Sequence, residues 1–235
     1  MNSLDLKKEL KKLSSEKKAK ASAWFFKTGL GQYGEGDLFI GVTVPEQRKI
    51  AKVFKDLPLA EVEKLLKSPI HEERLVSLLI LNGQFAKGNK TIKKEIYKFY
   101  LANTQFVNNW DLVDSSASYI VGTYLLDKPR EILYKLAKSP SLWERRISII
   151  STLAFIVKGE SSDTLKIAEV LLNDKEDLMH KAVGWMLREV GKRVSREELV
   201  SFLNKHYKNM PRTALRYAIE HFPEAERQKY LKGKA

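Results

Sequence analysis

The sequence contains no cysteine, which excludes disulfide bonds, thiolate zinc sites and cysteine nucleophiles together. Histidine is also scarce. The chain has four, at His71, His180, His206 and His221. None of them lies in a His-Glu-x-x-His or comparable cluster, which is the spacing that a metal site on a helix requires. We therefore expect no metal site and no cofactor.

Long apolar runs are missing as well. No segment approaches the roughly 18 consecutive apolar residues of a membrane span. Lys7, Lys8 and Lys11 interrupt the leucines at the start, so the chain lacks the apolar centre of a signal peptide. We expect a cytoplasmic protein without a membrane partner.

Acidic residues are outnumbered. The 235 residues include 42 Lys+Arg against 29 Asp+Glu, which gives a net charge of +13. This excess favours a polyanionic partner such as nucleic acid or an anionic membrane surface, and charge alone does not choose between them. With 43% hydrophobic residues, the chain can bury a substantial core.

Alternation of apolar and polar residues, the mark of a strand, is almost absent outside residues 38–44. Leu6, Leu10 and Leu13 have helical spacing among lysines, and residues 19–27 form a second helical stretch. Proline punctuates the rest, since it favours helix starts and breaks. We expect helices over 46–56, 59–67, 71–86, 91–103, 109–126, 129–138, 142–157, 163–173, 176–193, 195–206, 210–221 and 223–231. The fold is predicted to be all-α.

A charged cluster followed by an apolar helical run recurs along the chain. Its equivalent positions are Arg74, Trp110, Arg146, Lys181 and Arg216. Their period of about 36 residues lies within the range of helix-pair repeats. Such repeats stack into a superhelical solenoid that presents one residue per repeat along a concave surface. We expect one such domain over residues 1–235.

Trp110 and Asp114 are four residues apart on a predicted helix, so they lie on one face, one turn apart. Arg146 holds the equivalent position in the next repeat, and Trp185 lies in the repeat after that. Stacked repeats would place these side chains around a single concavity. The alternative is structural: a tryptophan in an apolar helix is often core, and an aspartate near a helix start is often a cap.

Residues 29–41 form a glycine-rich loop that matches the dinucleotide-binding spacing of glycines. That motif requires a strand before it and a helix directly after it, and neither is predicted here. We expect instead a structural loop that packs Tyr33 and Phe39. The N-terminal lysines favour a solvated helix face over an arm that contacts DNA.

Several strings together resemble one known family. They are residues 25–29, 34–37, 39–48, 110–114, 143–146 and 181–189. Over nearly the whole chain, the sequence resembles the DNA alkylation repair proteins, the AlkD-like DNA glycosylases built of HEAT-like repeats. It departs from the best-known pattern at Asn109, where a second tryptophan can occur, and in its glycine-rich loop.

The resemblance implies an enzyme and its site. It implies a monofunctional glycosylase that hydrolyses the N-glycosidic bond of cationic N3- and N7-alkylated purines in duplex DNA and leaves an abasic site. Asp114 would be catalytic, with Trp110 and Trp185 beside it. Arg146 would hold the flanking phosphate. The DNA-binding residues expected on the concave face are Arg74, Arg145, Arg146, Lys181, Arg188 and Arg216.

Two other functions remain open at this point. Some relatives bind DNA without detectable base excision, so the chain could be a non-catalytic HEAT-repeat DNA-binding protein. A helical-repeat scaffold for acidic proteins would need only the charge and the repeats. A carboxylate at Asp114 on a cationic face repels phosphate, which favours the enzyme over either alternative. We expect it to act as a monomer.

Overall fold

The computed structural model describes residues 1–234, and over this range the chain is α-helical with one isolated parallel bridge between Leu38 and Ile70. The prediction of an all-α fold is confirmed. The chain forms two compact units, Met1–Ser116 and Ala117–Ala235, here called the N-terminal and C-terminal units. The single domain expected from the repeats stays a prediction.

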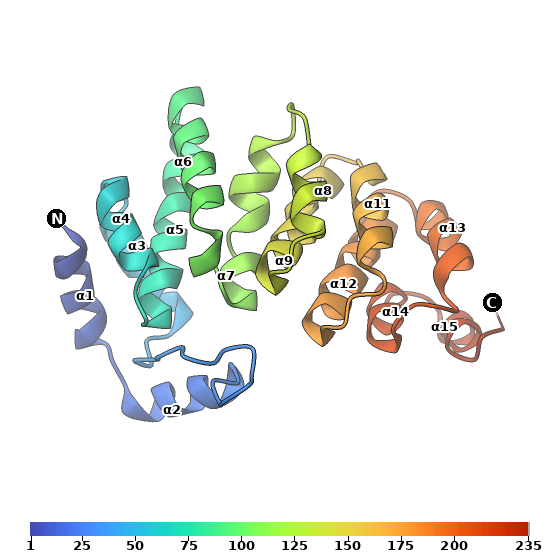
Figure 1. Ribbon diagram of the computed structural model, residues 1–235, viewed down its shortest axis with the longest axis horizontal. Helices are drawn as coiled ribbons and strands as arrows, with labels where there is room; N and C mark the ends of the chain where they lie inside the picture. The colour runs from blue at the N-terminus through green and yellow to red at the C-terminus, as the bar shows by residue number, and fades with distance from the viewer. Residues whose placement is uncertain (235) are drawn as a thin grey trace. The chain divides into compact units, whose positions relative to one another are not determined.

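The N-terminal unit has seven α-helices and a short 3-10 turn (Figure 1). They are α1 (Ser3–Lys12), α2 (Glu16–Phe25), α3 (Val44–Val53), α4 (Leu59–Leu66), α5 (His71–Lys87), α6 (Lys90–Ala102), η1 (Thr104–Phe106) and α7 (Trp110–Asp114). Helix α5 packs against α3, α4, α6 and α7. Most of its apolar side chains are buried, Leu78 and Leu81 fully, and they contribute to the core of this unit.

Helix α2 lies outside that core, while the loop after it contributes the buried residues Asp37 and Val42. No residue of α2 is buried, and the helix runs crosswise to α3–α6 in Figure 1. The loop returns to the helix where the amide of Ser15 donates to the carbonyl of Ile40 over 2.9 Å. Gly41 has φ 78°, and a Cβ there would lie 2.2 Å from the carbonyl oxygen of Ser15. Only glycine permits this close approach.

The C-terminal unit begins with a π-helical turn and continues with helix pairs. Its elements are η2 (Ser118–Gly122), α8 (Glu131–Ala137), α9 (Leu142–Ser151), α10 (Leu153–Ile156), α11 (Ser162–Leu171), α12 (Asp177–Arg193), α13 (Arg196–His206), α14 (Arg212–Ala218) and α15 (Glu224–Leu231). Helix α9 packs against α8 and α12, and α12 packs against α11, α13 and α14. A Cβ at Gly184 of α12 would lie 2.5 Å from the carbonyl oxygen of Ala214, so glycine lets α12 and α14 approach closely.

Two predicted helices are interrupted. The helix expected over 109–126 is divided into α7 and the π-helical η2, and the helix expected over 142–157 is divided into α9 and α10. Helix α7 therefore has only five residues. Turns and π-helical segments of this kind leave the main-chain ladder of an α-helix irregular. The consequence for Trp110 and Asp114 is that they occupy a single isolated turn.

No helix in the described part of the chain is long and apolar enough to cross a membrane.

Candidate functional site

Helix α7 carries Trp110 and Asp114 at its two ends, and Asn109 caps its start. The Asn109 side-chain oxygen accepts from the amide of Trp110 over 2.8 Å. Asn109 is fully buried, and its Nδ2 also donates to Asp37 Oδ2 over 3.0 Å. Because Asn109 is the cap, the interpretation of Asp114 as a capping residue is wrong. Asp114 is the last residue of α7 and is half-buried.

Trp110 lies against an aromatic cluster that the loop and the end of α2 supply. Its ring stacks on Phe26 with centroids 5.3 Å apart and planes 17° apart. Phe25 meets Trp110 edge to face at 6.0 Å. Phe26 in turn stacks on Phe39 at 5.1 Å, which confirms that the loop packs Phe39. Trp110 is half-buried, so this packing fixes the indole without removing it from the surface.

Beneath these rings lies a cluster of hydrogen-bonded polar and charged side chains, which we call the charge cluster: the buried Asp37, His71, Arg74 and Asn109, and the half-buried Asp111. His71 Nδ1 is 3.0 Å from Asp37 Oδ2, and its Nε2 is 2.8 Å from Asp111 Oδ2. Arg74 donates to Asp37 Oδ1 over 2.5 Å. Burial raises the pKa of Asp37, but the His71 hydrogen bond and the Arg74 charge outweigh it and hold this pKa below its ordinary value.

Arg74 must be removed from the expected DNA contacts. The residue is 3% exposed, and its guanidinium donates to Asp37 and to the carbonyl of Ser68. The repeat period made Arg74 equivalent to positions that were expected to present cations to DNA. The loop residue Asp37 instead supplies a buried partner for its guanidinium. A phosphate would have to displace that buried carboxylate.

Asp114 acts electrostatically on the buried residue Tyr100. The Tyr100 hydroxyl lies 2.9 Å from Ser116 Oγ, and the tyrosine is fully buried. Burial raises the pKa of Tyr100, and the negative charge of Asp114 raises it further. The Asp114 carboxylate therefore interacts electrostatically with the buried Tyr100 phenol.

The remaining predicted site residues belong to the C-terminal unit. Lys181, Trp185 and Arg188 recur at helical spacing on α12 and are half-buried, so they share one face, here called the α12 face. Lys181 pairs with Asp177 at 2.8 Å. Arg188 pairs with Glu189 at 3.2 Å and also with Glu220. The tryptophan thus lies between two cations that acidic neighbours hold in place.

The two arginines of α9 are held by the protein itself. Arg145 Nε donates to Asp174 Oδ2 over 2.6 Å, and its Nη1 donates to the carbonyls of Ser139 and Pro140. Arg146 is 4% exposed and donates from Nη1 to the carbonyl of Leu178 over 2.5 Å. Neither side chain is presented as the open phosphate contact that the sequence suggested. Arg216, in contrast, is exposed in the last turn of α14.

Sequence reasoning missed Asp37, His71, Phe25 and Phe26 as parts of this site. The signals were weak: Asp37 lies among loop glycines, and His71 looked like one more member of a repeated charged cluster. Their contacts join segments separated by 34 and 40 residues. The side-chain pattern of a single segment cannot reveal such pairs.

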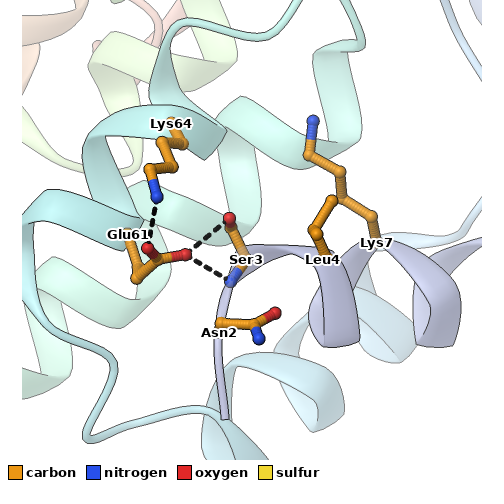
Figure 2. Close-up of a pocket in the computed structure, with 6 residues that line it drawn as sticks. All are labelled: Asn2, Ser3, Leu4, Lys7, Glu61 and Lys64. Atoms are coloured by element: carbon orange, nitrogen blue, oxygen red, sulfur yellow. Dashed lines mark hydrogen bonds and ion pairs between the residues drawn. The ribbon is translucent and has the colours of Figure 1, made fainter.

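A cavity of about 350 Å³ lies at the other end of the N-terminal unit, between α1 and α4 (Figure 2). Glu61 is one of the residues that line it and accepts from the Ser3 amide, the Ser3 hydroxyl and Lys64 over 2.7, 2.6 and 2.5 Å. The bond from Lys64, followed by those from Ser3, lowers the pKa of Glu61 to about 2. These hydrogen bonds satisfy the Glu61 carboxylate, so Glu61 fixes the start of α1 at this cavity. In the described residues no group of His, Asp or Glu side chains is arranged to hold a metal ion.

Comparison with known proteins shows which family has this sequence and fold. No curated protein sequence matches the chain. Among solved structures it is similar to a protein described as a predicted DNA alkylation repair enzyme from Enterococcus faecalis. The two share 16% sequence identity with a TM-score of 0.72 over 90% of this chain and 97% of the other. The family model for DNA alkylation repair enzymes matches residues 6–222, which include α7, the charge cluster and the α12 face. The chain therefore belongs to the DNA alkylation repair enzyme family.

Proposed function

We propose that this protein is a monofunctional DNA glycosylase that removes cationic N3- and N7-alkylated purines from duplex DNA by hydrolysis. The product is an abasic site and the free base. One observation carries the proposal: in a member of a DNA alkylation repair family, a single turn of helix presents a tryptophan and a half-buried carboxylate together.

The chemistry of the substrate explains why a carboxylate suffices. Alkylation at N7 or N3 gives the purine a positive charge, so the base is already a good leaving group and needs no strong acid. As the glycosidic bond breaks, positive charge moves onto the deoxyribose. Asp114, placed near C1′, would stabilise this oxocarbenium-like state and orient the attacking water. No lysine Schiff base is required, which is why we propose simple hydrolysis.

Trp110 would recognise the charge of the lesion. An indole face attracts a cation by up to about 2 kcal/mol where water is excluded. Phe26 covers one face of Trp110 in a near-parallel stack, and Phe25 holds its edge. The ring is thereby fixed before substrate arrives, so little orientation entropy is lost on binding. We propose the same recognition role for Trp185.

Duplex DNA is the partner that the charge supports. With a net charge of +13, the protein attracts phosphate over a long range at low salt. On the α12 face, Lys181 and Arg188 flank Trp185, and exchange of their acidic partners for phosphate would place a strand along this helix. Arg216 is exposed and would add a further phosphate contact.

The test is base release from methylated duplex DNA. The wild-type protein should release 7-methylguanine and 3-methyladenine, and should leave uracil and 8-oxoguanine in place because these bases are neutral. Asp114→Asn should slow release at least about a hundredfold, which is the scale for losing an electrostatic stabiliser. Its affinity for DNA should be equal or higher, since a charge that repels phosphate is gone. Base release would be measured by chromatography under single-turnover conditions.

Asp127→Asn is the matched control, because Asp127 is an exposed aspartate outside the site. It should excise at the wild-type rate. Binding of methylated duplex without any base release would favour the alternative, a non-catalytic DNA-binding protein. A wild-type rate in Asp114→Asn would remove this carboxylate from the mechanism.

A further inference from the structure

His71 lies at the junction between the loop, helix α5 and helix α7. It is the first residue of α5 and is 2% exposed. One ring nitrogen faces Asp37 at 3.0 Å and the other faces Asp111 at 2.8 Å. Phe26 and Phe39 cover the ring with centroids at 4.9 and 4.6 Å. Apolar packing alone does not account for a buried histidine that has a carboxylate at each ring nitrogen.

The geometry favours the doubly protonated form of this ring. An ionised carboxylate only accepts hydrogen bonds, so each His71 nitrogen must carry a proton to bond its neighbour. With His71 charged, the two carboxylates of Asp37 and Asp111 are balanced by His71 and Arg74. Deprotonation would leave a net negative charge in a buried place, which is costly. The stable state of the cluster therefore has a net charge of zero, with His71 as an imidazolium between the two carboxylates.

The pKa supports this reading of the geometry. Burial lowers the pKa of His71, but the hydrogen bonds to Asp111 and Asp37 outweigh it and raise the pKa to about 9. The other acidic groups of this turn are engaged elsewhere. Glu72 accepts from the amides of Ile40 and Gly41, and Glu73 pairs with Lys7 of α1 at 2.7 Å.

What His71 holds is the helix that carries the proposed chemistry. Asp111 follows Trp110 directly and precedes Asp114 by one turn. A five-residue helix has little stability of its own, so its anchors decide its orientation. His71 supplies an anchor through Asp111. It also lies against Phe26, the ring on which Trp110 stacks.

We propose that His71, as a buried imidazolium, is a positioning residue that fixes α7 and thereby sets Trp110 and Asp114 for catalysis. The inference rests on the proposed glycosylase function for its effect on rate. The arrangement of α7 in the protein without DNA depends on His71 in either case. This second consequence allows a failure of the positioning role to be told apart from a failure of the function.

The first experiment measures excision by His71→Gln under single-turnover conditions with saturating DNA. The glutamine can bond one carboxylate but carries no charge. We expect the excision rate to fall about tenfold to a hundredfold, the scale for a misplaced catalytic group, with DNA affinity nearly unchanged. In the wild-type protein the rate should also fall as pH rises through about 9, whereas the slow rate of His71→Gln should lack this titration. His221→Gln, an exposed histidine, is the matched control and should behave as wild type.

Two further variants separate positioning from folding. In His71→Gln/Asp111→Asn the unbalanced carboxylate is also removed, so the excision rate should recover in part relative to His71→Gln. In Asp111→Asn the largest favourable partner of the imidazolium is lost, so the pH at which the rate falls should move below about 9. A lower melting temperature with wild-type rate and wild-type pH profile would reduce His71 to a structural role and overturn the proposal.

A measurement without DNA completes the test. Replacing Trp24, Trp143 and Trp185 by Phe leaves Trp110 as the sole tryptophan. Its fluorescence should change with a midpoint near pH 9, and the change should vanish when His71→Gln is added. If the wild-type protein excises nothing but this titration is present, the glycosylase function fails while the control of α7 by His71 stands. Fluorescence that does not change with pH, with or without His71→Gln, would refute the control of α7 by His71.

Discussion

Arg74 and Arg216 begin and end the series of equivalent repeat positions, yet the structure treats them in opposite ways. Arg74 is 3% exposed and donates to Asp37 of a distant loop, whereas Arg216 is exposed in the last turn of α14. The period of the repeats fixes where a residue lies on its helix. Whether that place is core or surface depends on what else packs there. In the N-terminal unit the glycine-rich loop covers the position and brings a carboxylate with it.

The same contrast separates the charge cluster from the α12 face. In the cluster, the side chains of Asp37, His71 and Arg74 are no more than 4% exposed and that of Asp111 is 15% exposed. The two carboxylates balance the two cations. On the α12 face, the Lys181 and Arg188 side chains are 42% and 20% exposed, and their acidic partners Asp177 and Glu220 are 60% and 52% exposed. Buried pairs are costly to break, while exposed pairs exchange partners readily. The first arrangement suits holding a structure, and the second suits binding a polyanion.

The largest effect expected from this contrast is on stability. Arg74→Met leaves the Asp37 carboxylate buried with one cation fewer, which should lower the free energy of unfolding by about 3–5 kcal/mol. Arg216→Met, the matched change at an exposed position, should alter it by less than about 0.5 kcal/mol. Urea unfolding followed by circular dichroism would measure both. Adding Asp37→Asn to Arg74→Met should restore part of the loss, because the unpaired charge is removed. Similar small losses in both single variants would show that the charge cluster stabilises little.

The next effect is the pH dependence of stability. The pKa of His71 is raised to about 9 in the folded protein from 6.5, so its contribution to stability is complete below about pH 6.5 and is lost as pH rises through about 9. Over this window the free energy of unfolding should fall by about 3 kcal/mol more in the wild-type protein than in His71→Gln. Urea unfolding at pH 6 and at pH 9.5 would measure the difference. Equal losses in the two proteins would mean that folding does not raise the pKa of His71.

The sequence predicted more of the fold than of the site. The positions of the prolines and the spacing of apolar residues gave most helices, because these signals are local. The interruption of the helix expected over 109–126 was missed, because the apolar periodicity continues through the break between α7 and η2. The N-terminal lysines were expected to be solvated. Lys7 instead pairs with the buried Glu73, which no local pattern indicates.

At the site, the motif placed Trp110 and Asp114 together on one turn of helix, as the structure has them. It did not reveal what holds that turn. Asp37 and Asp111 are separated by the whole of α3–α6, and only the folded chain brings both to His71. The sharing of one concavity by Trp110, Asp114, Arg146 and Trp185 stays a prediction.

The smallest expected effect concerns the surface. If Arg216 neutralises one phosphate, Arg216→Ala should reduce the slope of log affinity against log salt by about 0.9 and weaken binding to all duplex sequences alike. Fluorescence anisotropy with undamaged duplex at several salt concentrations would measure this slope. Lys8→Ala, an exposed lysine on α1, is the control and should leave the slope unchanged if that face is merely solvated. The reverse result, a slope altered by Lys8→Ala and untouched by Arg216→Ala, would move the DNA to the α1 face. It would also show that Arg216, unlike Arg74 only in its exposure, does not bind DNA.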